Sequence, residues 1–427
     1  MVLVLGGVLL WWGVGGEGWG CVGMGAYLSQ PVTTKRLESG EDERFAYGVA
    51  DMQGWRNGME DAHLVRLDLG DAGHSGLFGV FDGHGGAEVA KLVSANLAQA
   101  VRGDAAFGTD VGGALSRAFV AMDELIMSRA GRRQLRQLQG EEMRAGGPGW
   151  GADDEDEDAD YVDEEGDGGG DLEVNGLVGA DGKLSVGFKE LRATTRTAGK
   201  GGLGGGESPE TLRAGEELRR AISSGGGGAG LEEDGELDDD DGEECVTQAG
   251  CTSVVACVRN GKLVVANAGD SRCVLCRAGE AVAMSEDHKP DDKAEYDRIV
   301  KAGGYVEDGR VNSSLNLSRA IGDMEYKLNK AITPAEQIVT AVPDVRVLDL
   351  KRDDEFLILA CDGIWDCMTN QQCVNFVRER LRRGESPKDI CAAVCDDCLA
   401  ADSATSTGIG CDNMTMMVVL LKPASIV

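Results

Sequence analysis

The sequence predicts an α+β domain in which strands are layered against helices. From Cys251 to Leu421, short runs of β-branched and aliphatic residues are bounded by Gly, Asp or Asn, which is typical of strands. Segments with apolar residues at three- and four-residue spacing stand between these runs and predict helices. Strands that bury one face, with helices covering the other, make a layered α+β domain.

The N-terminal half of the globular sequence, from about residue 44 to 140, alternates between strand and helix signals. Leu77 to Phe81 is a short apolar run and predicts a strand that ends just before Asp82. From Ala114 to Leu138, apolar residues recur at helical spacing, and one helix is predicted there. This half therefore contributes both kinds of element to the domain.

The C-terminal half is dominated by predicted strands, with helices between them. Its apolar runs have the length and the β-branched content of strands buried in a sheet. The predicted strands are TSVVACV (252–258), KLVVANA (262–268), CVLCR (273–277), FLILA (356–360) and NMTMMVVLL (413–421). The predicted helices cover residues 291–302, 371–383 and 387–400.

The net charge of −32 is concentrated in one segment. The 31 acidic and 9 basic residues between Glu141 and Glu244 carry −22 of it. Residues 141–245 are also rich in glycine and poor in branched apolar residues, so they cannot bury enough surface to offset the entropy of ordering. We expect a disordered acidic insert that interrupts one domain at 24–427. Such a chain should repel nucleic acid and attract basic proteins.

Residues 1–23 are predicted to be an N-terminal extension whose origin the sequence leaves open. The apolar run MVLVLGGVLLWW has no basic segment before it, which makes it a poor secretory signal, and its glycines and length disfavour a membrane span. A start at Met24 would give MGAYLS, which fits an N-myristoylation site at Gly25. A disordered tail is the remaining alternative.

The thirteen cysteines are predicted to be free, buried thiols in a reducing compartment. Cys273 and Cys276 fall on opposite faces of a predicted strand, whereas Cys391, Cys395 and Cys398 share the core face of a predicted helix. A zinc site is the alternative, but it needs four ligands that converge tetrahedrally, and these spacings disfavour it.

Aspartates recur at the ends of the predicted strands. Asp82, Asp270 and Asp362 follow apolar runs, and Asp412 precedes one. A single Asp-Gly pair is typical of a turn, but clustered carboxylates at a common rim repel one another unless a cation lies between them. Glu60, Asp82, Asp362 and Asp412 together carry −4, which two divalent cations would neutralise. Oxygen ligands favour Mg²⁺ or Mn²⁺ over zinc, and paired metals suit phosphoester hydrolysis.

Seven collinear motifs resemble the metal-dependent (type 2C) protein serine/threonine phosphatase family. They are MQGWRNGMEDAH (52–63), FGVFDGHGG (78–86), ANAGDSRCVL (266–275), EDHKP (286–290), GRVNSSLNLSRAIGD (309–323), LACDGIWDCM (359–368) and CDNMTMMVV (411–419). The start MGAYLSQP and the acidic insert most resemble the gamma-type branch. The resemblance implies a two-sheet antiparallel β-sandwich flanked by helices, with a binuclear metal site at one edge.

The resemblance also implies which residues bind metal. Two Mg²⁺ or Mn²⁺ ions per subunit, bridged by Asp82, would activate a water molecule as the nucleophile. The implied ligands of this pair are Glu60, Asp82, the carbonyl of Gly83, Asp362 and Asp412. Asp270 and Asp366 resemble ligands of a third, weaker metal.

Catalytic and supporting roles follow from the same motifs. Arg56 would bind the substrate phosphate, because a guanidinium matches phosphate oxygens bidentately. His84 would protonate the leaving serine or threonine alkoxide. His63 would orient the site from outside the ligand shell, and Asp323 is given a structural role. Without the motifs, Arg56 would be read as a surface ion pair and His84 as a turn hydrogen bond.

The expected enzyme is a monomer that acts on phosphoserine and phosphothreonine proteins in the cytoplasm or nucleus, without nucleic acid or a transmembrane span. A cysteine-dependent phosphatase is disfavoured, because no cysteine is followed by arginine six positions later. An acidic binding protein is the second alternative, and it is compatible with catalysis. The insert would then recruit basic substrates, or it would be a solvated spacer.

Overall fold

The computed structural model describes residues 2–5, 8–11, 20–23, 27–145 and 247–426. In the N-terminal extension, the described residues form three short antiparallel strands, β1 (Val2–Leu5), β2 (Val8–Trp11) and β3 (Gly20–Gly23). The predicted acylation site at Gly25 and the predicted insert from residue 146 onward lie outside the described residues.

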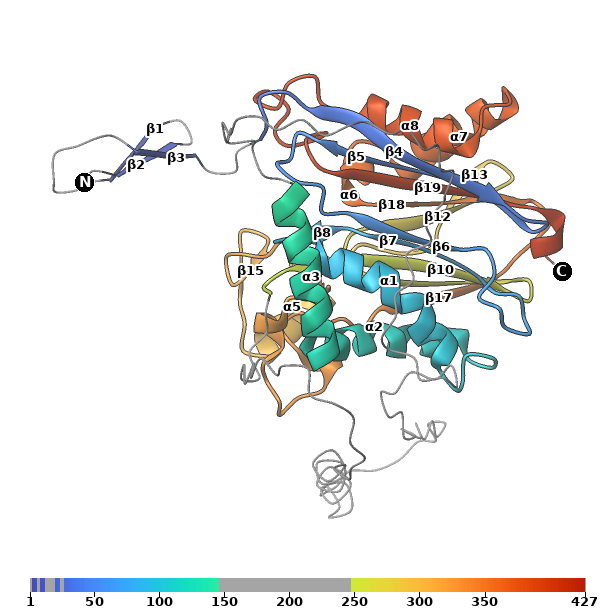
Figure 1. The fold of residues 1–427 in the computed structure, drawn as a ribbon, viewed down its shortest axis with the longest axis horizontal. Helices are drawn as coiled ribbons and strands as arrows, with labels where there is room; N and C mark the ends of the chain where they lie inside the picture. Colours follow the sequence, from blue (N-terminus) through green and yellow to red (C-terminus); the bar gives the residue numbers. More distant parts are fainter. Residues whose placement is uncertain (1, 6–7, 12–19, 24–26, 146–246, 427) are drawn as a thin grey trace, which may run out of the picture. The chain divides into compact units, whose positions relative to one another are not determined.

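Two antiparallel sheets form the centre of the fold (Figure 1). The six-stranded sheet has the order β13 (Glu280–Ala283), β12 (Arg272–Arg277), β18 (Asp354–Ala360), β19 (Met414–Leu421), β5 (Phe45–Gly54) and β4 (Val32–Glu41). The five-stranded sheet has the order β17 (Asp344–Asp349), β11 (Lys262–Ala268), β10 (Ser253–Arg259), β7 (Gly76–Phe81) and β6 (Ala62–Arg66). All strands predicted in the C-terminal half are present, as is the strand over 77–81.

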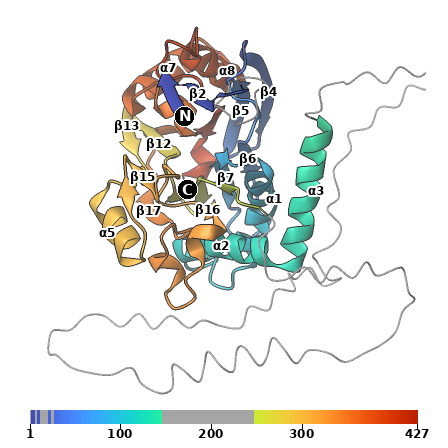
Figure 2. The same ribbon diagram turned by 90° about the vertical axis from the view of Figure 1, so that its left-hand side faces the viewer.

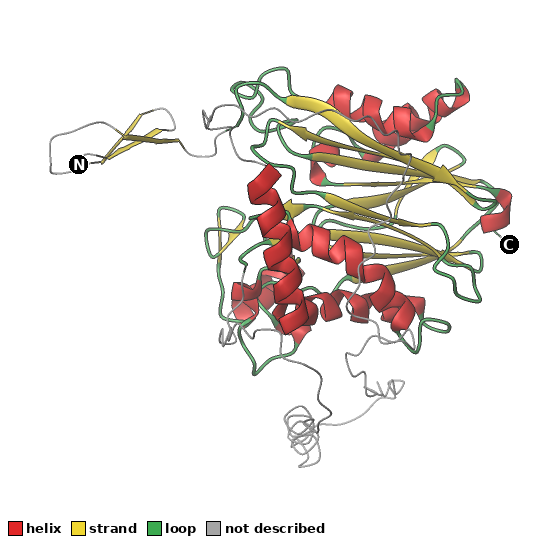
Figure 3. Cartoon of the chain, viewed as in Figure 1, coloured by secondary structure: helices red, strands yellow, loops and turns green. Residues whose placement is uncertain are grey.

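Helices cover the outer face of each sheet, so the layers run helix, sheet, sheet, helix (Figure 3). On the five-stranded sheet lie α1 (Glu88–Gly103) and α2 (Val111–Met127), and α3 (Arg129–Ala145) packs against both helices. On the six-stranded sheet lie α7 (Asn370–Arg382) and α8 (Pro387–Cys398). The view in Figure 2 separates these two helical layers. The predicted α+β sandwich is confirmed.

The inner strands β7, β10, β11, β18 and β19 are nearly continuous apolar runs because both of their faces are buried, whereas the edge strands β4 and β17 are largely exposed. In β10, Val254 and Ala256 face the other sheet, whereas Val255 and Cys257 face the helices. Between the sheets, the rings of Phe45 and Phe78 meet edge to face with centroids 5.3 Å apart. Each inner strand therefore supplies two layers of the core.

The cysteines follow this layering. Cys273 packs between the two sheets and Cys276 packs under α7 and α8, on opposite faces of β12 as predicted. Cys391, Cys395 and Cys398 on α8 all join the core below that helix. All the cysteines from Cys251 to Cys411 are free thiols.

The prediction of one helix over 114–138 is wrong at Ser128. Ser128 has an extended backbone (φ −74°, ψ 157°) that ends α2, and its Oγ accepts a hydrogen bond of 3.0 Å from the Gly131 N–H at the start of α3. Apolar periodicity continues across this break, so it could not reveal the turn. Helix α3 then runs to Ala145, five residues into the predicted insert.

Smaller elements complete the fold around the edge where the strands end. They are β8 (Gly83–His84), β9 (Gly250–Cys251), β14 (Val306–Glu307), β15 (Arg310–Val311), β16 (Ile321–Gly322), α5 (Lys293–Lys301), α6 (Asp362–Trp365), and the 3₁₀ turns η1 (Met324–Lys327) and η2 (Pro334–Glu336). A further 3₁₀ turn, η3 (Pro423–Ser425), follows β19 at the opposite edge. None of the helices in the described ranges combines the length and apolar character that crossing a bilayer requires.

Candidate metal centre

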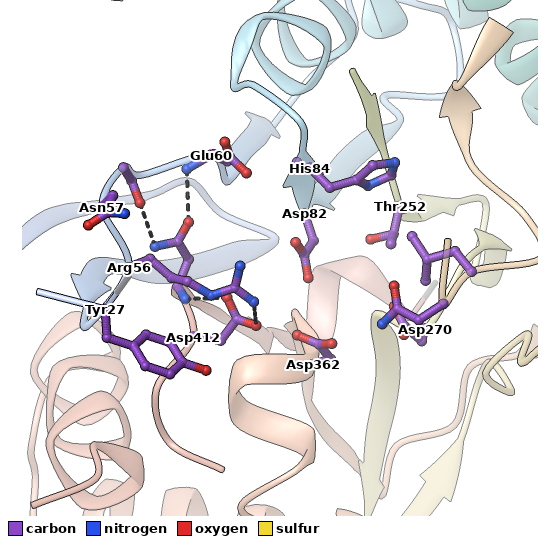
Figure 4. Close-up of a pocket in the computed structure, with 15 residues that line it drawn as sticks. Tyr27, Arg56, Asn57, Glu60, Asp82, His84, Thr252, Asp270, Asp362 and Asp412 are labelled. Carbon is purple, nitrogen blue, oxygen red and sulfur yellow. Dashed lines mark hydrogen bonds and ion pairs between the residues drawn. The ribbon is translucent and has the colours of Figure 1, made fainter. Parts of the chain in front are cut away.

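One cavity of about 680 Å³ opens at the edge of the sandwich and collects most of the predicted site residues (Figure 4). Strands β7, β11 and β18 end at this edge and β19 begins there, as the strand-end argument requires. The predicted residues that line the cavity are Arg56, Glu60, Asp82, Gly83, His84, Asp270, Asp362 and Asp412. Residues that lie far apart in the sequence therefore meet at one place.

Three carboxylates form the centre of the cavity. One side-chain oxygen from each of Asp82, Asp270 and Asp362 lies within 4.8 Å of the other two. The backbone beside them is crowded, because a Cβ on Gly83 would lie 2.3 Å from the Glu60 carbonyl oxygen. A side chain could not be accommodated at Gly83 without moving the loop that carries Glu60.

The electrostatics of this cluster call for a cation. Burial raises the pKa of Asp82 well above its ordinary value, and the nearby carboxyls of Asp61, Asp362 and Asp270 raise it further. Burial and the neighbouring Asp270 and Asp412 act in the same direction on the pKa of Asp362. Ionised carboxylates this close are unstable alone, and divalent cations with oxygen preference fit the donor set.

Asp61 is part of the cluster, although the sequence analysis did not select it. It is only 5% exposed, and neither carboxylate oxygen makes a hydrogen bond of normal geometry within the described residues. One oxygen lies within 4.8 Å of an Asp82 oxygen and the Cys361 sulfur, and burial raises the pKa of Asp61 to about 7. The available signal was the acidic pair in MEDAH, of which only Glu60 was chosen.

Arg56 and Asp412 are joined across the rim of the cavity. Arg56 Nη2 lies 2.5 Å from Asp412 Oδ2, and the Arg56 side chain is about half exposed. Asn413 ties the same loop down, since its amide donates to the carbonyls of Gln53 and Gly58 at 2.8 and 2.9 Å. Its side-chain oxygen accepts the Glu60 N–H at 2.9 Å. The position of Arg56 and Glu60 therefore depends on Asn413, a residue that the sequence analysis did not weigh.

His84 is held by a buried aspartate. Its Nε2 lies 2.8 and 2.9 Å from the two oxygens of Asp323, which sits in the left-handed backbone region with φ 49°. Burial lowers the pKa of His84, but the bond to Asp323 more than offsets this, and the pKa is raised overall. A Cβ on Gly250 would lie 2.3 Å from Asp323 Oδ2, so the contact also needs glycine there. Asp323 thus contacts a predicted catalytic residue directly.

The two predicted ligands of a third metal are placed differently. Asp270 is buried in the cavity wall, and its Oδ2 lies 2.5 Å from Lys289 Nζ. Asp366 ends α6 and is exposed, and it does not line the cavity. Burial and the charge of Asp270 nevertheless raise the pKa of Asp366, and the charge of Asp366 helps to raise the pKa of Asp362. The third site stays a prediction.

His63 lies on β6, away from the cavity lining. Its ring nitrogens are 3.2 Å from Asp51 Oδ1 and 3.0 Å from Glu38 Oε2. Burial lowers the pKa of His63, but these two carboxylates raise it to about 9 overall. These contacts connect His63 to β4 and β5, and its predicted role in orienting the metal ligands stays a prediction.

Comparisons with known proteins find relatives over most of the chain. The family described as protein phosphatase 2C matches residues 45–146 and 227–407. The chain is 42% identical over 400 residues to "Probable protein phosphatase 2C 11" of Oryza sativa subsp. japonica, across 93% of this chain and 91% of that protein. It is also 42% identical over 400 residues to "Probable protein phosphatase 2C 60" of Arabidopsis thaliana, across 93% and 92%.

A solved structure shares the fold. A phosphatase from a pathogenic strain of Toxoplasma gondii matches with a TM-score of 0.54 at 20% identity, covering 91% of this chain and 96% of that one. At this identity the likeness concerns the fold alone, and it agrees with the layered sandwich described above.

Proposed function

Because this chain belongs to the protein phosphatase 2C family, and is therefore a metal-dependent serine/threonine phosphatase acting on phosphoproteins, we propose that hydrolysis occurs in the cavity at the edge of the sandwich. The observation that carries the proposal is the convergence of Asp82, Asp270 and Asp362 within 4.8 Å, together with the unsatisfied oxygens of Asp61. Such an arrangement favours a cation between the carboxylates.

We propose that two Mg²⁺ or Mn²⁺ ions are held by Glu60, Asp82, the Gly83 carbonyl, Asp362 and Asp412. When bound, such ions lower the pKa of water, and this water supplies the nucleophile for phosphoester hydrolysis. They also offset the negative charge of the phosphate. Asp61 supports this pair from its buried position beside Asp82. The all-oxygen donor set supports hard cations over zinc.

The remaining side chains have roles that follow from their chemistry. Arg56 binds the phosphate through its half-exposed guanidinium, next to Asp412. His84 carries a proton and donates it to the leaving alkoxide. Its Nε2 is engaged by Asp323, so Nδ1 is the atom that serves the leaving oxygen. Cysteine chemistry is disfavoured further, because burial raises the pKa of Cys361, whose sulfur lies within 4.8 Å of an Asp61 and an Asp82 oxygen, well above its usual range.

We also propose the gamma-type branch as the closest type within the family. The start MGAYLSQP and the acidic segment support this assignment. A reducing compartment, in the cytoplasm or nucleus, stays a prediction from cysteine usage.

The test is a phosphothreonine peptide assay with and without Mn²⁺ and chelator, with Asp82→Asn as the variant. We expect turnover only with the metal, and a loss of at least about 100-fold in Asp82→Asn, because the variant removes a central ligand. Calorimetric titration with Mn²⁺ should show weakened binding in the variant, while circular dichroism shows an unchanged fold. Undiminished turnover in chelator would overturn the proposal.

A further inference from the structure

The catalytic cavity has one exposed aromatic wall, and the segment before the first sheet strand supplies it. Tyr27 lines the cavity and is 40% exposed. Among the lining residues, Leu317 is the other one with a large apolar side chain, but it is only 5% exposed. A molecule entering the cavity therefore meets carboxylates, amides and a guanidinium on most sides, and an exposed aromatic side chain at Tyr27.

The backbone next to Tyr27 is fixed to the loop that carries Arg56. The Leu28 N–H donates to the Trp55 carbonyl at 2.8 Å. Trp55 is itself buried, and its Nε1–H donates to the Ala400 carbonyl at 2.9 Å. The residue after Tyr27 is therefore hydrogen-bonded to a buried tryptophan, and Arg56 directly follows that tryptophan in the sequence.

Figure 4 shows Tyr27 on the same side of the cavity as Arg56 and Asp412, across from His84 and Thr252. A phosphate that is bound by Arg56 would therefore place the substrate residues next to the phosphorylated one within reach of this ring. The neighbouring guanidinium disfavours a cationic side chain at that position. A tyrosine ring offers a large contact area with few rotatable bonds, which suits an apolar partner.

We propose that Tyr27 is a specificity-determining residue whose ring packs against an apolar side chain flanking the phosphorylated serine or threonine. This inference rests on the proposed function, since it takes Arg56 as the phosphate-binding residue. It makes the N-terminal segment part of the substrate-binding wall. The enzyme then prefers phosphopeptides with a large apolar residue beside the phosphoresidue over those with glycine there.

The test compares two phosphothreonine peptides that differ only in having leucine or glycine on both sides of the phosphothreonine. Tyr27→Ala should lower kcat/KM about tenfold on the leucine peptide, mainly through KM, and less than about twofold on the glycine peptide. Tyr27→Phe should behave like the unmodified protein on both peptides. Inhibition by inorganic phosphate should be unchanged in both variants, because the phosphate contacts remain.

Tyr296→Ala is the matched control, because Tyr296 on α5 is 44% exposed but does not line the cavity. It should leave both peptides unaffected. Equal losses on both peptides, no loss in Tyr27→Ala, or an equal loss in Tyr27→Phe would overturn the inference. The last result would assign the hydroxyl to the phosphate instead.

A second readout separates this inference from the proposed function. The affinity of each peptide is measured by calorimetry in the Asp82→Asn background, with and without Tyr27→Ala. A leucine-dependent loss of affinity is expected there as well, and its absence would count against Tyr27. Failure of the proposed function would instead appear as turnover that ignores Mn²⁺ and chelator.

Discussion

At the scale of single residues, the bond between His84 and Asp323 determines the orientation of the His84 imidazole, the proposed general acid. The carboxylate holds Nε2, so the ring orientation is set by a residue on a different segment of the chain. Gly250 leaves room for the pair, because any Cβ there would overlap both side chains. The contact between His84 and Asp323 therefore depends on three segments of the chain. A single substitution at His84, Asp323 or Gly250 should disturb the position of the proposed general acid.

We predict that His84→Gln affects poor leaving groups most. Hydrolysis of a phosphothreonine peptide should fall about 100-fold, while p-nitrophenyl phosphate, whose leaving group needs no proton, should fall less than about tenfold. The measurement is kcat for each substrate under saturating Mn²⁺. His74→Gln serves as the control, since His74 is exposed and pairs with Asp68. Equal losses on the two substrates would remove His84 from the role of acid.

At the scale of elements, α5 is held to the rest of the fold by a buried ion cluster. Glu295 is 3% exposed and lies 2.6 Å from both Arg298 Nη1 and Arg319 Nη2, and it accepts the Ser318 hydroxyl at 2.8 Å. Arg319 continues to Asp344 at the start of β17. Burial alone would raise the pKa of Glu295, but the two arginines lower it to about 2.

The cluster predicts an acid-dependent loss of stability. Because the folded pKa of Glu295 lies below its unfolded value, its contribution is present above pH 4.5 and is lost as the pH falls towards 2. Glu295→Gln should lower the unfolding free energy at pH 7 by about 3 kcal/mol, since the partly buried Arg298 loses its carboxylate partner and Arg319 keeps only Asp344. Urea titrations at pH 7 and pH 3 should show a smaller difference between variant and parent at pH 3.

Glu336→Gln is the control for this experiment. The pKa of Glu336 is also lowered to about 2, through Lys301 and Thr333, but its side chain is 42% exposed and lies at the protein surface. Solvent screens such a pair, so the substitution should change stability little. If both glutamine variants destabilised the protein equally, burial would not be what gives the α5 cluster its strength.

At the scale of the whole molecule, the acidic segment between the two halves of the domain offers a test of substrate recruitment. The chain leaves α3 at Ala145, and the described structure resumes at Thr247. Replacing residues 146–246 with a short Gly-Ser linker should lower kcat/KM for a basic phosphopeptide several-fold at low salt and have little effect at about 0.5 M salt, where charge attraction is screened. An acidic phosphopeptide should be unaffected.

The control for that deletion is hydrolysis of p-nitrophenyl phosphate, which should be the same with and without the segment. Equal changes on acidic and basic peptides would show that the segment is a spacer. A loss of activity on all substrates together with a lower melting temperature would assign it a structural role instead.

The sequence by itself determined the strands, the layering and the family. Apolar runs with turn residues at their ends report local conformation and burial, which is why β10, β11 and β18 were predicted closely. It also placed carboxylates at the strand ends. The break at Ser128 escaped detection, because the periodicity of apolar residues carries no information on a capped turn.

Only the tertiary structure decided which side chains meet. Arg56 and Asp412 are 356 positions apart, and His84 and Asp323 are 239 positions apart. Asp61, Asn413 and Tyr27 joined the site for the same reason, since the sheet edge brings their segments together. Contacts of this range depend on how two sheets stack and where their strands end, which no local pattern of residues records.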